Sequence, residues 1–342
     1  MSKKVVVTGG AGYIGSILVR MLLEQGWQVR VVDRLYWGEA PLAPVLDQIE
    51  LLQQDVRDLR DDVLEGVDAV VHMAGLSNDP TAEMNPEANH QMNAVATRRL
   101  AEACRRMKVA RLSYGSSCSI YDGLPTGPVY DENAEVEPRG AYATSKYEGE
   151  LALLEHASDD FSPIILRQGT VYGASPRMRF DLVVNTFVKA AVQNGELQLH
   201  GGGWMWRPLV DVKDVARAHI ACLDAPRDKV HAQTFNVVHD NYQIRGLAML
   251  VAGSAQMRKY RPELKDAPLP KIVRDYKCDN TKMRQMVGFT PQVTVLESVE
   301  EMLLGIERNG FIDFNHPRYY NIAWMTLLDE LHPYLSKFPS VF

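Results

Sequence analysis

The residue pair best suited to chemistry is a tyrosine and a lysine four positions apart, Tyr142 and Lys146, in the run YATSK. At this spacing the two side chains lie on one face of a helix, one turn apart. A tyrosine ordinarily loses its proton near about pH 10, so it is a poor base at neutral pH. The Lys146 ammonium would favour the phenolate. We interpret the pair as a base that removes a hydroxyl proton while a hydride leaves the same carbon for a positively charged acceptor.

A glycine-rich run indicates what that acceptor is. The sequence TGGAGYIG, residues 8–15, follows the apolar residues 5–7. A buried strand that ends in glycines and runs into an apolar helix is typical of the first βα turn of a dinucleotide-binding fold. We expect Gly9 to make the tight turn, Gly12 to let backbone N–H groups approach a pyrophosphate, and Gly15 to let the helix pack closely on the strand. The spacing G-x-x-G-x-x-G alone would also fit a glycine turn before an ordinary surface helix.

An acidic residue at the end of the second apolar segment supports the dinucleotide interpretation. Residues 28–32 form that segment and Asp33 ends it. An acid at this place accepts hydrogen bonds from the adenosine ribose hydroxyls and repels a 2′-phosphate. Asp33 therefore favours NAD over NADP, although Arg34 stands beside it.

Two further segments are expected beside the cofactor. Asp55-Val56 follows the next apolar segment, and we expect it at the adenine edge. Residues 69–75, AVVHMAG, predict a fourth buried strand that runs into a turn of small residues. We interpret His72 in that run as a packed residue at the strand end.

Strand-like and helix-like segments alternate through the first half of the chain, which predicts an α/β fold with a doubly wound parallel sheet. We expect one long helix over 86–107, a helix over 142–156, and strands at 209–210 and 234–238 that return to the main sheet. The alternation breaks after about residue 174, which indicates a smaller, discontinuous α/β substrate-binding domain. The expected Rossmann domain comprises 1–173 and 207–240, and the second domain comprises 174–206 and 241–342.

Composition restricts the function classes. The 342 residues are 46% hydrophobic and 23% charged, with a net charge of −6. No basic run suggests a nucleic-acid partner, and no apolar segment reaches the roughly 20 residues that span a bilayer. The four cysteines have no metal-ligand spacing and are expected to be reduced thiols. We therefore expect a cytoplasmic protein without a signal peptide, a bound metal or a membrane or nucleic-acid partner.

Several motifs together give the chain a specific resemblance. They are TGGAGYIG, Asp33, Asp55-Val56, HMAG, Asn93, SSCSIY, YATSK, LRQGTVYG and RPLVDVKDVA. With these motifs the chain resembles the extended short-chain dehydrogenase/reductase family, specifically its NAD-dependent nucleotide-sugar epimerases and dehydratases, of which UDP-glucose 4-epimerase is one.

The resemblance implies roles for individual residues. Ser117 would be the catalytic hydroxyl, Tyr142 the base, and Lys146 the residue that binds the nicotinamide ribose. The cofactor would lie against Gly9, Gly12, Tyr13, Ile14, Gly15, Asp33, Asp55, Val56, Met73, Ala74, Gly75, Asn93, Ser116, Tyr142, Lys146 and Gly169. A nucleotide-diphosphate sugar would lie against Ser117, Thr170, Arg179, Asn185 and Arg207. The resemblance also implies a homodimer, with the helices at 86–107 and 142–156 forming a four-helix bundle.

The residues after Ser117 bear on which reaction of the family to expect. The 4,6-dehydratases have Asp-Glu after their catalytic hydroxyl residue, whereas this chain has Cys118 and Ser119. The decarboxylases carry a glutamate near this position, and 4-keto-sugar reductases often prefer NADP. We therefore expect a C4 epimerase with retained NAD, and we interpret Cys118 as a structural thiol. The alternatives are a nucleotide-sugar reductase or dehydrogenase, a dehydratase, or a non-catalytic NAD-binding protein.

Three arginines leave the substrate open. Arg177 and Arg179 resemble a loop of enzymes that act on UDP-glucuronate, and a guanidinium suits a sugar carboxylate. They fit equally well on a solvated loop or against phosphate. Arg274 is a candidate for a second diphosphate-binding arginine. No role follows for the segment 318–342.

Overall fold

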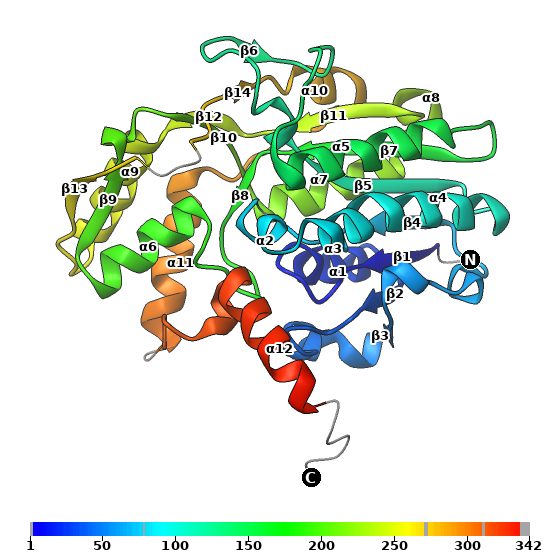
Figure 1. Cartoon of the computed structure of the whole chain (residues 1–342), viewed down its shortest axis with the longest axis horizontal. Coiled ribbons are helices and arrows are strands. Elements are labelled where there is room, and N and C mark those ends of the chain that lie inside the picture. The colour runs from blue at the N-terminus through cyan, green and yellow to red at the C-terminus, as the bar shows by residue number, and fades with distance from the viewer. Residues whose placement is uncertain (1–2, 78, 270–272, 310–311, 336–342) are drawn as a thin grey trace.

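A seven-stranded, fully parallel sheet forms the centre of this computed structural model, in the order β11-β7-β5-β4-β1-β2-β3 (Figure 1). The structure describes residues 3–77, 79–269, 273–309 and 312–335, so the expected domain ends at 1–2 and 336–342 lie outside it. The strands are β1 (Lys4–Thr8), β2 (Gln28–Asp33), β3 (Ile49–Gln53), β4 (Ala69–His72), β5 (Arg111–Ser117), β7 (Ser162–Gln168) and β11 (Gln233–Val237).

Helices cover both faces of this sheet, as predicted for a doubly wound fold. They include α1 (Gly15–Glu24), α4 (Ala96–Arg106), α5 (Gly140–Glu155) and α7 (Val212–Asp224). Val5 and Val7 pack with α1 and α7, whereas Val6 packs with α4 and α5 on the opposite face. Alternate residues of β1 are therefore buried on both sides, which explains its unbroken valine run.

The long helix expected over 86–107 is present but not uniform. It consists of α3 (Pro86–His90), a π-helical turn η4 (Gln91–Val95) and α4. A π turn adds a residue locally and is often found at functional sites. Here it contains Asn93, one of the predicted cofactor residues.

The strand expected at 209–210 does not return to the main sheet, and that prediction is wrong. It lies in β10 (Trp206–Asp211), which pairs with β8 (Thr170–Tyr172) and β12 (Asp240–Gln243) in a separate three-stranded sheet. The chain leaves the main sheet at Gly169, where a Cβ atom would lie 2.9 Å from the Pro208 carbonyl oxygen. Such a short apolar stretch does not indicate which sheet it joins. The expected strand at 234–238 does belong to the main sheet, as β11.

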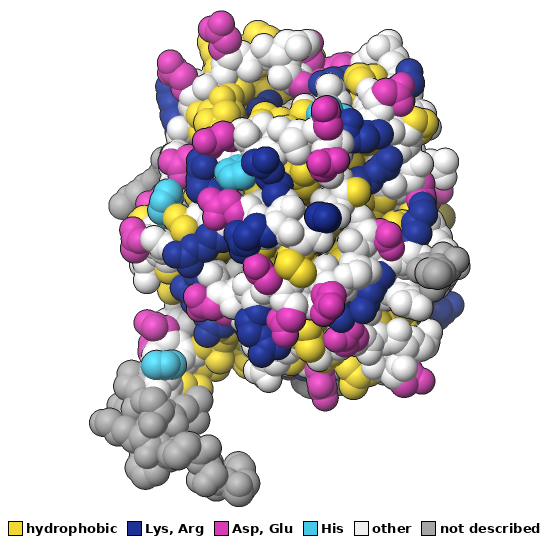
Figure 2. All heavy atoms as spheres, turned by 90° about the vertical axis from the view of Figure 1, so that its right-hand side faces the viewer, with side chains coloured by type: hydrophobic (Ala, Val, Ile, Leu, Met, Phe, Trp, Pro, Cys, Tyr) yellow, Lys and Arg dark blue, Asp and Glu magenta, His cyan; other side chains and the backbone are white. Residues whose placement is uncertain are grey.

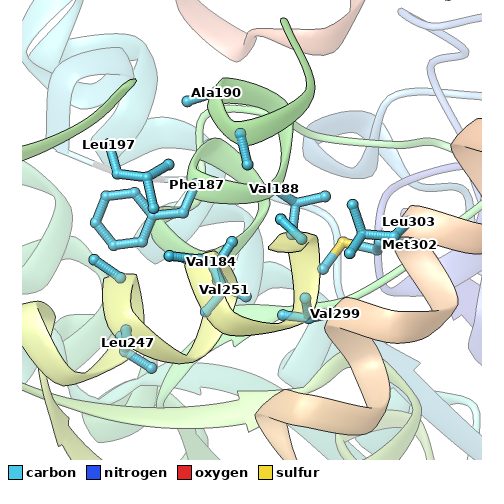
Figure 3. Close-up of a cluster of buried hydrophobic side chains, with 14 of the residues drawn as sticks. Val184, Phe187, Val188, Ala190, Leu197, Leu247, Val251, Val299, Met302 and Leu303 are labelled. Atoms are coloured by element: carbon cyan, nitrogen blue, oxygen red, sulfur yellow. The ribbon is translucent and has the colours of Figure 1, made fainter. Parts of the chain in front are cut away.

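A second hydrophobic core lies outside the main sheet (Figure 3). Its elements are α6 (Val183–Gln193), β9 (Glu196–His200), α9 (Ile244–Met257) and α11 (Val295–Asn309). Phe187 of α6 lies beside Leu197 of β9, and Val251 of α9 packs in the same cluster. The expected division of the chain into two domains remains a prediction.

Further helices and strands belong to the described part of the chain. The helices are α2 (Asp79–Met84), α8 (Arg227–Val230), α10 (Thr281–Val287) and α12 (Asn321–Leu335), and the 3-10 segments that concern the site are η1 (Ala40–Gln48) and η5 (Cys118–Tyr121). The remaining strands are β6 (Val129–Tyr130), β13 (Glu263–Ala267) and β14 (Lys277–Cys278).

The surface seen in Figure 2 mixes basic and acidic side chains, with hydrophobic ones between them. This face therefore lacks the concentration of positive charge that binds nucleic acid. Within the described part of the chain, no helix combines the length and apolar character needed to cross a bilayer.

Candidate active site

The glycine turn between β1 and α1 packs as its sequence predicts. Gly9 has a φ of +73°, and a Cβ atom on it would lie 2.7 Å from the backbone nitrogen of Ala74. A Cβ atom on Gly15 would collide with the Gly9 carbonyl oxygen. Neither position can hold a side chain without movement of the backbone, so the turn stays narrow.

A pocket lies against this turn. It sits at the carboxyl ends of β1, β2 and β4, where the strand order reverses and such folds bind dinucleotides. The predicted cofactor or substrate residues that line it are Gly9, Gly12, Tyr13, Ile14, Gly15, Asp33, Val56, Met73, Ala74, Gly75 and Arg179. Residues with no role assigned from sequence also line it, among them Tyr36, Trp37, Ser77, Asn321 and Met325.

Asp33 is held in place by backbone donors. Its Oδ2 accepts from the Ala11 N–H at 3.0 Å and its Oδ1 accepts from the Leu35 N–H at 2.7 Å. Burial raises the pKa of this carboxyl, and the two backbone hydrogen bonds oppose that rise. The arrangement leaves acceptor capacity at the pocket wall for ribose hydroxyls.

The end of β4 is anchored by His72. Its Nδ1 lies 2.7 Å from Thr8 Oγ1 and its Nε2 lies 3.0 Å from Thr97 Oγ1. Burial lowers the pKa of His72 to about 3, so the ring is neutral. The Thr8 hydroxyl also accepts from the Ala74 N–H at 3.2 Å. His72 is thus a packed strand-end residue, as predicted, and it fixes the turn that lines the pocket.

Two of the predicted catalytic residues, Ser117 and Tyr142, lie together at the end of β5. Tyr142 on α5 shares a side-chain hydrogen bond with Ser117. Burial raises the pKa of Tyr142, whereas this hydrogen bond and the nearby Arg274 cation lower it. The Ser117 hydroxyl also accepts from the Ser119 N–H at 3.1 Å, which fixes the hydroxyl at the start of η5.

Lys146 lies one turn along α5 and is buried. Its Nζ donates to the Gly115 carbonyl at 2.8 Å and lies 4.8 Å from the centre of the Tyr114 ring. Burial lowers the pKa of Lys146 to about 8, and Glu150 opposes that shift. A Cβ atom on Gly75 would lie 3.6 Å from this Nζ, so the ammonium lies beside the turn that lines the pocket.

A cluster of four charged residues lies near Tyr142, and only its two arginines were considered from sequence. Arg274 forms ion pairs with Asp79 and, at 3.6 Å, with Asp122. Arg207 is close enough to Arg274 and Asp122 to interact electrostatically with both, and burial lowers its pKa. Asp79 also raises the pKa of Tyr142. No local sequence pattern predicts the two acids as site residues, because Asp79 begins α2 and Asp122 follows η5, far apart in the sequence.

Two of the predicted cofactor residues bond other protein groups. The Ser116 hydroxyl lies 2.5 Å from Glu150 Oε1, and Glu150 in turn pairs with Arg167. The Asn93 amide nitrogen donates to the Leu76 carbonyl at 2.9 Å. Its Oδ1 is buried without a partner among the described residues, so one acceptor remains open on this side chain.

Other predicted residues lie outside the pocket lining. Asp55 pairs with Arg34 at 2.9 Å and with Arg57 at 2.6 Å. Asn185 is fully buried, and it accepts from the Gly173 N–H at 3.0 Å and donates to the Arg179 carbonyl at 2.8 Å. Binding of adenine by Asp55 and of phosphate by Asn185 stays a prediction, as do the roles of Gly169 and Thr170.

The arginine loop after β8 is buried, so the alternative of a solvated loop is wrong. Arg177 is 5% exposed and Arg179 is 6% exposed. Arg179 forms a two-pronged ion pair with Asp181, at 2.8 and 3.0 Å. Arg177 has no such partner in the part of the chain that the structure describes.

Comparison with known proteins gives the family. The profile of the NAD dependent epimerase/dehydratase family matches residues 5–237. The chain belongs to this family. A dTDP-glucose 4,6-dehydratase of Streptomyces niveus is 28% identical, over 87% of this chain and 91% of its own. A UDP-glucose 4-epimerase of Mycolicibacterium smegmatis is 30% identical, over 86% of this chain and 96% of its own. The structure of MoeE5 in complex with UDP-glucose and NAD aligns with a TM-score of 0.76 at 26% identity. The alignment covers 90% of this chain and 99% of the MoeE5 chain.

As a member of this NAD-dependent epimerase/dehydratase family, the chain uses NAD. The residues present fit that cofactor, because the narrow glycine turn and the Asp33 carboxylate line one pocket, and the open Asn93 acceptor lies against Gly75 in its wall. Cys118 is buried and donates to the Arg167 carbonyl at 3.2 Å, beside Cys278. All four cysteines are free and buried, which agrees with Cys118 as a structural thiol.

Proposed function

We propose that this protein epimerises a nucleotide-diphosphate sugar at C4 through a transient 4-keto sugar. The observation that carries the proposal is that the Ser117 hydroxyl interacts with the Tyr142 phenol, which lies on the same helix as the buried Lys146 ammonium, one turn away. Bound NAD would supply the acceptor, and later the donor, of the C4 hydride. The Tyr142 oxygen takes the C4 hydroxyl proton and later gives it back, while Ser117 holds the same sugar oxygen. The Lys146 cation favours the phenolate during this exchange.

The side chains after Ser117 support a simple redox cycle. The Cys118 thiol is turned to the Arg167 carbonyl, and Ser119 is 1% exposed. Neither position offers a carboxylate for a second proton transfer at C5 or C6. Rebinding of the keto sugar with its opposite face presented is then enough to invert C4.

The charged cluster near Tyr142 supports a diphosphate-linked substrate. Arg207 and Arg274 lie close together, and both interact electrostatically with Asp122. A diphosphate would compete with Asp79 and Asp122 for these two guanidinium groups. We place Thr170 and Asn185 beside the sugar nucleotide only by resemblance to the family.

An uncharged hexose is the substrate class we favour over a sugar acid. The Arg179 guanidinium, the candidate for a sugar carboxylate, is already neutralised by Asp181. A comparison of UDP-glucose with UDP-glucuronate should show preference for the former. A preference for UDP-glucuronate that Arg179→Ala removes would reverse this choice.

The direct test incubates the purified protein with UDP-, dTDP-, GDP- and CDP-sugars and analyses the products by mass spectrometry and NMR. An isomer of unchanged mass, inverted at C4, is expected, with no net change in NADH absorbance. Loss of water, loss of carbon dioxide, or a gain or loss of two hydrogens would each overturn the proposal and select a named rival.

One observation favours a second candidate, a dehydratase. Asp79 interacts electrostatically with Tyr142 and its Oδ1 is buried without a partner among the described residues. Such a carboxylate could carry a proton during elimination of water. Reaction in D2O separates the two, because elimination places deuterium on sugar carbons whereas direct return of the hydride does not. Loss of that label in Asp79→Asn would assign the step to this residue.

A further inference from the structure

The C-terminal helix α12 forms a wall of the dinucleotide pocket, although it lies beyond the residues that the family profile matches. Asn321 and Met325 of α12 line the pocket together with the glycine turn and Asp33. Figure 1 shows α12 beside the segment that joins β2 to β3. The helix is therefore a structural part of the cofactor site.

Hydrogen bonds tie α12 to three other walls of the same pocket. Trp324 Nε1 donates to the Tyr36 carbonyl, in the loop after β2, at 2.6 Å. Asn321 Nδ2 donates to Ser77 Oγ, in the loop after β4, at 2.8 Å. The Asn321 N–H donates to Asp181 Oδ2, in the arginine loop, at 3.2 Å. Three segments that are far apart in sequence thus meet at the start of one helix.

Arg177 is the cation that this arrangement holds in the pocket wall. Its Nη2 donates to Asn321 Oδ1 at 2.6 Å, and its guanidinium lies 4.0 Å from the centre of the Trp37 ring. Arg177 Nε and Trp37 Nε1 are both buried and without a hydrogen-bond partner in the described chain. Both residues line the pocket.

Two unpaired buried donors, one of them cationic, are unfavourable unless a ligand satisfies them. Burial, together with the neighbouring Arg179 cation, lowers the pKa of Arg177 to about 9. The Asp33 carboxylate, which lines the same pocket, makes a 2′-phosphate an unfavourable ligand. The anionic acceptor that a dinucleotide without this group offers is its pyrophosphate.

We propose that Arg177 and Trp37, held in position by α12, bind the pyrophosphate of the dinucleotide, and that α12 thereby retains the cofactor. A charge-assisted hydrogen bond from a planar guanidinium suits phosphate oxygens. The inference needs only NAD binding and is independent of the reaction proposed for the sugar.

The pyrophosphate contact is tested by calorimetry on the full-length protein freed of nucleotide. Arg177→Met should weaken the binding of NAD and of ADP-ribose at least about tenfold and leave the binding of adenosine unchanged. Only NAD and ADP-ribose carry the pyrophosphate. The matched control is Arg261→Met, an exposed arginine whose guanidinium bonds backbone carbonyls away from the pocket. Unchanged NAD affinity in Arg177→Met, or an equal loss for adenosine, would overturn the assignment.

Retention by α12 is tested by the rate of NAD release after rapid dilution. Trp324→Phe keeps an aromatic side chain but removes the hydrogen bond to Tyr36. Asn321→Ala removes the contacts to Arg177 and Ser77. Both should release NAD several-fold faster than the parent protein, with circular dichroism and thermal unfolding confirming a folded chain. Trp204→Phe, at a tryptophan 60% exposed, is the control. Release of NAD at the parental rate in both α12 variants would refute the retaining role of α12. This test does not depend on whether Arg177→Met folds.

Discussion

Burial and hydrogen bonding have opposite effects on the pKa of the Tyr142 phenol. Burial raises its pKa, and the Ser117 hydrogen bond and the Arg274 cation lower it. The resting side chain is thus a protonated phenol. We propose that positive charge from Lys146 and from the oxidised nicotinamide would turn it into a base.

Replacement of Tyr142 by phenylalanine removes the proton acceptor but preserves the ring. We expect turnover to fall by at least about 10²-fold, the usual contribution of a positioned acid-base group. NAD should remain bound, because the pocket beside the glycine turn is untouched. Steady-state kinetics and the nucleotide content of the purified variant check both outcomes. Tyr147→Phe, on the same helix, is the control and should keep parental activity.

At the scale of elements, the packing of α1 on the turn after β1 requires glycine at particular positions. Gly15 lies at the first position of α1, where a Cβ atom would press on the Gly9 carbonyl. Helix α1 can therefore pack this closely on the turn after β1 only with glycine at position 15. The π turn η4 plays a similar positioning role for Asn93, whose open acceptor faces the Gly75 backbone.

Gly15→Ala should destabilise the fold by about 1–3 kcal/mol, the typical cost of overpacking a buried contact, and should weaken NAD binding. Chemical denaturation and calorimetry measure the two effects. The control is Gly253→Ala in α9, where a Cβ atom would meet nothing within 4 Å. That substitution should stabilise the protein by about 0.5–1 kcal/mol, as alanine does in a helix interior. A tolerated Gly15→Ala would contradict the close packing described for α1.

For the whole molecule, we propose a homodimer in which α4 and α5 pack against the same helices of a second copy. Leu151 of α5 is 48% exposed in the single chain, which suits an apolar contact between copies. Leu151→Arg should convert the dimer to a monomer, and light scattering measures this change in mass. Met249→Arg, at a residue of α9 that is 61% exposed, should leave the assembly unchanged. A parent protein that is already monomeric would exclude the proposal.

The stability of the whole molecule should fall in mild acid because of buried neutral histidines. Burial lowers the pKa of His72 and of His219 from 6.5 to about 3. The unfolded chain therefore binds more protons than the native protein between these values, so stability present above about pH 6.5 is lost as the pH falls toward 3. Each histidine contributes up to about 1.4 kcal/mol per pH unit in this window.

Urea unfolding at pH 7, 6 and 5 measures this dependence. His219→Gln should reduce the slope of the unfolding free energy against pH by up to one proton relative to the parent protein. His200→Gln, at an exposed histidine, is the control. An unaltered slope in His219→Gln would show that this residue is not held neutral in the native state.

The sequence by itself determined the main sheet and the dinucleotide turn. Unbroken apolar strands, glycines at fixed spacing and the i, i+4 pair of Tyr142 and Lys146 act through neighbouring residues, so their patterns can be read locally. The tertiary structure alone decided what lies opposite them. In the folded chain β10 belongs to a second sheet, the Ser116 hydroxyl bonds Glu150, and Asp79 lies near Tyr142. The tertiary structure also brought α12 and Arg177 to the cofactor pocket, because contacts between segments distant in the chain depend on how the elements pack and leave no periodic signal in the sequence.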